Sequence, residues 1–201
     1  MKTRTKHSTN SPIKKSTPSQ IRVIGGRWRG QKLSFVPIEG LRPTGDRIRE
    51  TLFNWLAPVI HNAHCLDLFA GSGALGFEAL SRGAQSTTFI ELDPSAIALL
   101  QQNETHLKTE HANIVGANAI DWLKTTKPPQ PFDVVFLDPP FAANLFQSCC
   151  DLLQQERFLA NNAYIYIEMD SQQQAPITPD SWLLLKEKTT GQVTYRLYHT
   201  D

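Results

Sequence analysis

Five short apolar runs separated by helical stretches occupy the chain from His64 onward, and they constrain its fold more than any other feature. The runs are rich in β-branched and aromatic residues and read CLDLF, STTFIE, ANIVGA, FDVVFLD and AYIYIEM. Helical stretches begin between them near Gly73, Pro94, Ala119 and Ala143. Strands that alternate with helices pair in parallel through right-handed crossovers, which puts helices on both faces of the sheet. We therefore predict an α/β fold with a doubly wound, mostly parallel sheet.

Two further segments predict hairpins near the ends of the chain. WLLLKEKTTGQVTYRLYH contains two strand-like runs joined by Thr190 and Gly191, so an antiparallel pair is expected to complete a seven-stranded sheet. IRVIGGRWRGQKL places two β-prone pieces around a Gly-Gly pair, which predicts a small hairpin appendage. The basic side chains expected to project from this appendage are Arg22, Arg27 and Arg29.

A helix and a tail complete the expected organisation. Apolar residues recur at three- and four-residue spacing in the segment that begins near Thr44, which predicts a helix that ends at Pro58. The N-terminal tail is rich in Lys, Ser, Thr and Pro and has almost nothing to bury. We therefore expect a disordered basic tail at 1–20, an N-terminal hairpin at 21–43 and a main domain at 44–201.

Charge is distributed unevenly along the chain, although its formal net value is only +1. Residues 1–50 contain 12 Lys or Arg and 3 acidic residues, so this part carries a net charge of +9 and the remainder carries −8. Clustered Lys and Arg are the footprint of a surface that neutralises the phosphates of a nucleic acid. A solvated tail beside a charged face is the alternative, and charge alone does not choose between the two.

The overall composition excludes several classes of protein. No apolar run approaches the roughly 18 residues that a membrane-spanning helix needs, and no apolar segment of a secretory signal precedes Ile21, so we expect a cytoplasmic protein. Cys65, Cys149 and Cys150 lack the spacing of a disulfide framework or a zinc site. His61 and His64 lie close to Cys65 but have no second pair of ligands, so we expect no metal.

A glycine-rich turn after the first of the five runs predicts a nucleotide-binding loop. The segment from Asp67 to Gly76 reads DLFAGSGALG and opens a helix, whose N-terminal N–H groups and close-approaching backbone suit a bound nucleotide. Gly71, Gly73 and Gly76 also satisfy the G-x-G-x-x-G pattern of dinucleotide-binding oxidoreductases. Glu91 ends the next run, where an acid can accept hydrogen bonds from both ribose hydroxyls of either cofactor.

The segment Asp138-Pro139-Pro140-Phe141 separates these two interpretations. It follows FDVVFL, and two successive prolines hold it rigid and leave carbonyl oxygens as acceptors. Asp138 can accept one hydrogen of an exocyclic amine, the Pro139 carbonyl the other, and Phe141 can stack on the base. This arrangement would orient the lone pair of a poorly nucleophilic amine toward an electrophilic methyl group. A hydride-transferring enzyme has no use for it.

These motifs carry a resemblance to a known family. DLFAGSG, FIELD and DPPF resemble the cofactor loop, the ribose-binding acid and the catalytic loop of class I methyltransferases that act on base amines. Together with IGGRWRG, LRPTGDRIRETLFNWL and GQVTYRLY, they resemble the bacterial small-subunit ribosomal RNA guanine-N2 methyltransferases over nearly all of residues 21–201. The resemblance implies S-adenosylmethionine as methyl donor and one guanine of 16S ribosomal RNA, in the head of the small subunit, as target.

The resemblance also implies roles for individual residues. Asp67 and the loop of Gly71, Ser72 and Gly73 would border the methionine end of the cofactor, and Glu91 its ribose. The remaining residues implied at the cofactor are Phe69 in the loop motif, Asn118 and Ala119 at the adenine, and Thr44. Those expected at the RNA are Arg22, Arg27 and Arg29 of the hairpin together with Arg42 and Arg47, although Arg42, Thr44 and Arg47 would also suit a cofactor carboxylate.

Several alternatives remain open from the residues alone. Glu168 could line the base pocket or be a satisfied carboxylate at a strand end, and Trp28 could stack on a nucleotide or form the core of the hairpin. The rival functions are an adenine-N6 methyltransferase on DNA or RNA, an NAD-dependent oxidoreductase, and an RNA-binding assembly factor without turnover. We expect a monomeric methyltransferase that acts on 16S ribosomal RNA within a partly or fully assembled small subunit.

Overall fold

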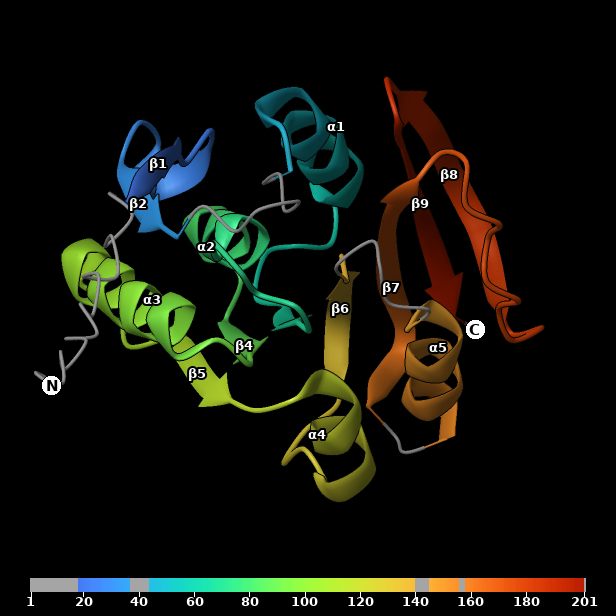
Figure 1. Ribbon diagram of the computed structural model, residues 1–201. Coiled ribbons are helices and arrows are strands. Elements are labelled where there is room, and N and C mark those ends of the chain that lie inside the picture. Colours follow the sequence, from blue (N-terminus) through green and yellow to red (C-terminus); the bar gives the residue numbers. More distant parts are fainter. Residues whose placement is uncertain (1–17, 37–43, 140–144, 156–157, 201) are drawn as a thin grey trace, which may run out of the picture.

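The computed structural model describes residues 18–36, 44–139, 145–155 and 158–200 (Figure 1). Most of the basic tail, Arg42, Pro140, Phe141 and Ala143 lie outside the described residues. None of the helices in the described ranges is both long enough and apolar enough to cross a membrane.

A seven-stranded sheet with the order β5-β4-β3-β6-β7-β9-β8 forms the centre of the protein (Figure 1). The first five strands in this order are parallel, and β9 is antiparallel to both β7 and β8. The strands are β3 (His64–Asp67), β4 (Ser86–Glu91), β5 (Ala112–Gly116), β6 (Phe132–Leu137), β7 (Leu159–Asp170), β8 (Trp182–Thr190) and β9 (Val193–Thr200). The predicted doubly wound sheet with a C-terminal antiparallel hairpin is therefore confirmed.

Helices cover both faces of this sheet (Figure 1). They are α1 (Asp46–Leu56), α2 (Ala74–Ser81), α3 (Pro94–Leu107), α4 (Ala119–Thr125) and α5 (Phe146–Gln155). Side chains of α1, α2 and α3 share one buried cluster with one face of the sheet, and side chains of α4 and α5 share a second cluster with the other face. Because the central strands β3 and β6 are covered on both sides, their apolar runs are almost continuous, as in parallel sheets generally.

Local capping explains where two of the helices begin. The Asp93 side chain accepts hydrogen bonds from the N–H groups of Ser95 and Ala96, and Pro94 occupies the first turn of α3. Asn118 caps α4 in the same way. Such side chains satisfy backbone N–H groups that have no partner within the helix.

The longest strand differs from its prediction. AYIYIEM predicts a strand from Ala163, but β7 begins four residues earlier, at Leu159, which pairs with Phe132. The register then shifts before Val134 pairs with Tyr164, and Asn162 in this stretch has a positive φ of 61°. A bulge of this kind inserts residues without ending the pairing. The apolar pattern alone therefore does not reveal the additional strand residues before Ala163.

The predicted N-terminal hairpin is present and packs against α2 and α3. It consists of β1 (Ser19–Arg22) and β2 (Lys32–Phe35), with a short 3-10 helix η1 (Gly26–Trp28) between them. The Trp28 N–H donates to Ser81 Oγ at 2.9 Å, and Ser34 exchanges two hydrogen bonds of 2.9 Å with the Asn103 side chain. The hairpin is thus tied to the main domain through polar contacts as well as through the core that includes Leu33.

A buried ion pair joins the hairpin, α1 and α2. Arg49 and Glu78 are both fully buried, and Arg49 Nη1 lies 3.7 Å from Glu78 Oε2. The same Glu78 oxygen accepts the Ile24 N–H at 2.8 Å, while Oε1 accepts Arg82 Nε at 2.7 Å. Arg49 Nη2 donates to the Arg22 carbonyl at 2.9 Å. The Glu78 carboxylate therefore accepts hydrogen bonds from the hairpin and from Arg82, and its charge lies beside Arg49 of α1.

We expect Glu78→Gln to lower the free energy of unfolding by about 3 kcal/mol, because it removes the only fully buried carboxylate beside the Arg49 guanidinium among the described residues and leaves only the half-exposed Asp46, whose Oδ1 lies 2.6 Å from Arg49 Nη2. Urea unfolding followed by tryptophan fluorescence measures this change. Glu50→Gln is the matched control, since Glu50 lies on the exposed side of α1. A loss below about 1 kcal/mol in Glu78→Gln would show that the pair does not hold these elements together.

Candidate functional site

Three carboxylates lie at the carboxyl ends of adjacent strands. Asp67 ends β3, Asp138 follows β6 and Glu168 lies near the end of β7. Side chains alternate between the two faces of a sheet, and Cys65, Phe136 and Tyr166, each two residues before one of these acids, belong to the same buried cluster.
The three acids therefore face the side covered by α1 and α2. In open α/β sheets this edge is where ligands bind.

The loop after β3 has a cradle for a ligand beside Glu91. Gly71 has a φ of 48°, and a Cβ built on it would meet nothing nearer than the Phe69 carbonyl oxygen at 3.9 Å. The Gly71 N–H donates to Glu91 Oε2 at 2.7 Å. Glu91 Oε1 accepts the N–H groups of Leu92 and Asp93, both at 2.8 Å. Glu91 thus holds the loop in place, and the space beside Gly71 stays open for a ligand.

Asp67 forms a hydrogen bond with the backbone of the first turn of α2. Its Oδ2 accepts the Gly76 N–H at 3.0 Å, and only 3% of the residue is exposed. A Cβ on Gly76 would meet the Phe89 ring at 2.2 Å, so the third glycine of the motif is needed for close packing of α2 on β4. Burial raises the pKa of Asp67 to about 7, the Gly76 hydrogen bond lowers it, and the charge of Glu91 raises it further.

Asp138 lies beside Thr44, which is two residues before the first residue of α1. Thr44 is buried and its Oγ1 donates to Asp138 Oδ2 at 3.2 Å. Burial raises the pKa of Asp138 well above its ordinary value, the charges of Glu168 and Asp67 raise it further, and the Thr44 hydrogen bond lowers it. Thr44, which the sequence placed at the cofactor, therefore contacts the predicted catalytic acid. Pro139 is buried next to it.

Glu168 belongs to the same cluster. Its Oε2 accepts the Tyr166 hydroxyl at 2.7 Å, and only 3% of Glu168 is exposed. Burial raises the pKa of Glu168, whereas hydrogen bonds from Tyr166 and Thr44 lower it. Sequence reasoning left Glu168 open and missed Tyr166, although their two-residue spacing within a strand signals that they share a face.

The other residues expected at the cofactor have local structural roles. Ser72 Oγ accepts the Ala74 N–H at 3.3 Å at the start of α2, and the Asn118 carboxamide caps α4. Ala119 is buried and Phe69 is half-buried. Phe69 and Ser72 thus lie in the same loop as Gly71. Asn118 follows β5, at the same edge of the sheet.

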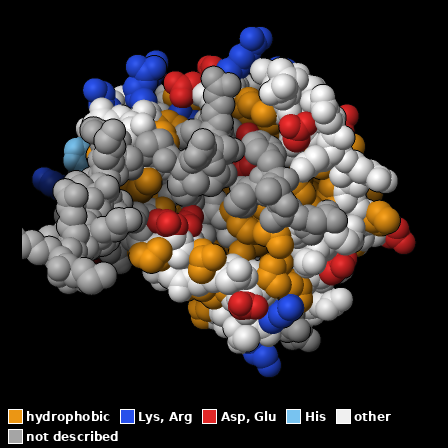
Figure 2. Space-filling view, viewed as in Figure 1, with side chains coloured by type: hydrophobic (Ala, Val, Ile, Leu, Met, Phe, Trp, Pro, Cys, Tyr) orange, Lys and Arg blue, Asp and Glu red, His pale blue; other side chains and the backbone are white. Residues whose placement is uncertain are grey.

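Basic side chains of the hairpin and α1 gather along one edge of the molecule (Figure 2). Arg27 and Arg29 are exposed, and the Arg27 guanidinium lies 4.1 Å from the centre of the Trp28 ring. Trp28 is partly buried and packs against the main hydrophobic cluster, so part of its role is structural. Arg22 is exposed and lies 3.7 Å from Asp46, and Arg47 is exposed on α1.

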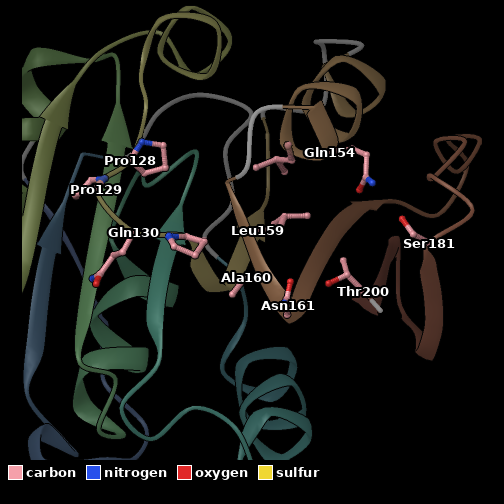
Figure 3. Close-up of a pocket in the computed structure, with 11 residues that line it drawn as sticks. Pro128, Pro129, Gln130, Gln154, Leu159, Ala160, Asn161, Ser181 and Thr200 are labelled. Atoms are coloured by element: carbon pink, nitrogen blue, oxygen red, sulfur yellow. The ribbon is translucent and has the colours of Figure 1, made fainter.

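A pocket of about 680 Å³ lies at the opposite edge of the sheet (Figure 3). Residues near the amino ends of β6 and β7 line it together with residues of α5 and the chain before β8. Its lining residues are Pro128, Pro129, Gln130, Pro131, Leu153, Gln154, Leu159, Ala160, Asn161, Ser181 and Thr200. Because the described residues of this lining include no acid, base or cysteine, the carboxyl edge is the better candidate for chemistry.

We expect the stability of the protein to depend on Asp67 between about pH 4 and 7. Its pKa is raised on folding to about 7, so its stabilising contribution is present at low pH and is lost as pH rises through that value. Asp67→Asn keeps an acceptor for the Gly76 N–H but cannot ionise. The difference in free energy of unfolding, variant minus wild type, should therefore increase from pH 5 to pH 8 in urea titrations.

Asp180→Asn is the control, because Asp180 lies in an exposed turn. If the difference in free energy of unfolding between Asp67→Asn and the wild type were the same at both pH values, the pKa of Asp67 would not be raised by folding.

Comparison with known proteins places this site in a family. The family model described as "Conserved hypothetical protein 95" matches residues 21–199. The protein named "Ribosomal RNA small subunit methyltransferase D" from Haemophilus influenzae is 52% identical over 181 residues, which cover 89% of this chain and 93% of the relative. Its namesake from Escherichia coli strain K12 is 49% identical over 186 residues, with 92% and 93% coverage.

The solved structures support the same assignment. A structure from Escherichia coli matches with a TM-score of 0.82 and 50% identity, and the match covers 91% of this chain and 99% of that one. The resemblance drawn from the sequence motifs is thus confirmed at the level of the family. The chain belongs to the conserved hypothetical protein 95 family, together with the ribosomal RNA small subunit methyltransferases D of Haemophilus influenzae and Escherichia coli.

Proposed function

We propose that this protein transfers a methyl group from S-adenosylmethionine to the N2 amine of a guanine in 16S ribosomal RNA. The observation that carries the proposal is the position of Asp138. Its carboxylate lies at the carboxyl edge of the sheet, held by Thr44, on the same edge as the glycine cradle at Gly71. Methyl transfer to a base amine requires a hydrogen-bond acceptor for the amine and a binding site for the cofactor at the same edge of the sheet.

The loop residues fit S-adenosylmethionine. The open space above Gly71 lets a ligand lie against the backbone, and Glu91 Oε2, which accepts one N–H, has a second lone pair for a ribose hydroxyl. Gly73 caps α2, whose N-terminus adds the positive end of a helix dipole. When bound, the cofactor supplies an electrophilic methyl group on a positively charged sulfur. The nearby acids Asp67 and Glu91 suit such a cation electrostatically.

Asp138 prepares the amine for methyl transfer in this proposal. Its carboxylate accepts one hydrogen of the N2 amine and the Pro139 carbonyl accepts the other, so the nitrogen lone pair faces the methyl carbon. A nitrogen–carbon bond forms as the carbon–sulfur bond breaks, and the electron pair of the broken bond leaves with the sulfide. The surplus proton of the amine then passes to Asp138 or to water.

The basic edge of the hairpin is proposed to hold the RNA. Arg27 and Arg29 are exposed there, whereas the bulk of the acidic residues lies later in the chain. A base in structured RNA must leave its stack to reach Asp138, at a cost of about a few kcal/mol. Contacts between arginines and phosphates contribute binding free energy that offsets this cost.

Methyl transfer from labelled S-adenosylmethionine tests the function directly. Unmodified 16S ribosomal RNA and unmodified small subunits serve as separate substrates, and the product is digested and identified as a nucleoside. The expected product is N2-methylguanosine. N6-methyladenosine would identify the enzyme as an adenine methyltransferase, thermal stabilisation by NAD alone would favour an oxidoreductase, and binding without transfer would favour an assembly factor.

We expect Asp138→Ala to slow single-turnover methyl transfer by roughly 100-fold or more at saturating cofactor, because a preorganised polar partner of the amine is removed. Asp138→Asn should retain more activity, since its amide oxygen still accepts a hydrogen. Asp151→Asn, on the exposed side of α5, is the control. A wild-type rate in Asp138→Ala would remove Asp138 from the mechanism.

The pH dependence of the same reaction gives a second readout. The pKa of Asp138 is raised, chiefly by burial, so the acceptor becomes charged only as pH rises above the ordinary range of an aspartate. The wild-type rate should therefore increase with pH across that raised pKa, and Asp138→Asn should lose this limb of the profile.

We expect Arg27→Ala combined with Arg29→Ala to weaken RNA binding and to reduce the slope of log affinity against log salt by up to about 2, because each contact with a phosphate releases counterions. Lys186→Ala combined with Lys188→Ala is matched in charge and lies on β8, at the opposite end of the molecule from the hairpin (Figure 1). Equal salt slopes for the two double variants would contradict an RNA surface on the hairpin.

A further inference from the structure

Asp138, Glu168 and Tyr195 form a polar row across neighbouring strands. Leu137 pairs with Ile167 in the parallel register of β6 and β7, so the next positions along the strands are Asp138 and Glu168. Glu168 in turn pairs with Tyr195 in the antiparallel register of β7 and β9. Paired residues in adjacent strands project to the same face, so the row continues the predicted catalytic acid across the sheet.

Within the described ranges of the chain, this row has few hydrogen-bond donors. Two carboxylates lie in it, and the charge of Glu168 raises the pKa of Asp138 after the larger effect of burial. The Thr44 hydroxyl, which has a single hydrogen, donates to Asp138 Oδ2 and also lowers the pKa of Glu168. Tyr166 supplies one further donor, to Glu168 Oε2. Two neighbouring N–H groups placed at the pair would relieve the repulsion between these acids.

A second observation also indicates a missing partner in the row. Tyr195 is fully buried, and its hydroxyl has no hydrogen-bond partner among the described residues. Burial raises the pKa of Tyr166, and the nearby Glu168, Asp138 and Tyr195 raise it further, as expected if the four groups lie close together. Buried hydroxyls are nearly always paired, so this row has room for a further polar partner, such as an ordered water or a bound polar group.

We propose that Glu168 is a specificity-determining residue, which accepts the N1–H of the guanine whose N2 amine is held by Asp138. The inference rests on the proposed function and adds to it the contact that distinguishes guanine from adenine. The Watson–Crick edge of guanine presents the N1–H and the N2 amine side by side, two donors for two neighbouring carboxylates. Adenine presents its N6 amine beside N1, which is an acceptor, so its lone pair would face the Glu168 carboxylate.

The same contact explains the position of Thr44. Its hydroxyl donates to Asp138, an acceptor that the guanine edge would use, and Thr44 lies just before Gly45, the N-cap of α1. In the complex, the two donors of the base take over from this one hydroxyl. A site that already holds a donor against both acids is organised for a base edge rich in donors.

The test uses 16S ribosomal RNA fragments in which the methylated guanine is kept or replaced by 2-aminopurine. 2-Aminopurine retains the amine at carbon 2, but its N1 is an acceptor. The wild-type protein should prefer guanine by roughly 10- to 100-fold in kcat/KM, the effect of a hydrogen bond to a charged acceptor. In Glu168→Gln the amide can donate to N1 of 2-aminopurine, so the preference should fall to about threefold or less.

The controls separate specificity from structure. Glu187→Gln changes an exposed carboxylate on β8 and should leave the preference for guanine unchanged. Parallel losses on both RNAs in Glu168→Gln, with the preference retained, would show a structural role and overturn the inference. If that variant does not fold, the wild-type ratio decides: a preference below about threefold overturns the inference as well. Absence of N2-methylguanosine from the wild-type reaction instead rejects the proposed function, and the inference with it.

Discussion

Hydrogen bonding between β6 and β7 pairs Leu137 with Ile167, and the arrangement of the whole carboxyl edge follows from this register. Because side chains alternate along each strand, a shift of one residue would turn Glu168 away from Asp138 and toward the helices of the other face. The apolar residues on both faces hold the register in place. The chemistry of the site is therefore fixed by the same packing that stabilises the sheet.

The hairpin is held to this sheet by a different kind of interaction. Glu78 accepts hydrogen bonds from the hairpin backbone and from Arg82, and it lies beside the buried Arg49. Burying these charges costs desolvation free energy. The group nevertheless fixes the orientation of the hairpin, because the buried charges need their partners in place. The protein thus combines an apolar sheet, which positions the acids, with a polar joint, which positions the basic surface relative to them.

The periodic parts of the chain could be predicted from sequence, and the convergent parts could not. The β runs and the DLFAGSG motif are local patterns, so the mostly parallel sheet, the glycine loop and the edge that carries Asp138 follow from general rules. The contact of Thr44 with Asp138 joins residues 94 positions apart, and no pattern near either residue signals it. The buried pair of Arg49 and Glu78 escaped for the same reason, since single charges in helices usually face solvent.

The hairpin precedes, in the sequence, the two helices on which it packs, so its partners are made much later. Its hydrogen bonds reach Glu78, 54 residues beyond Ile24, and Asn103, 69 residues beyond Ser34. Closing such long loops carries an entropic cost that only the finished helices offset. During translation, β1 and β2 therefore leave the ribosome before α2 and α3 exist, and the full set of these contacts can form only after α3 has been synthesised. The basic hairpin thus acquires its final orientation relative to the sheet only after both helices have formed.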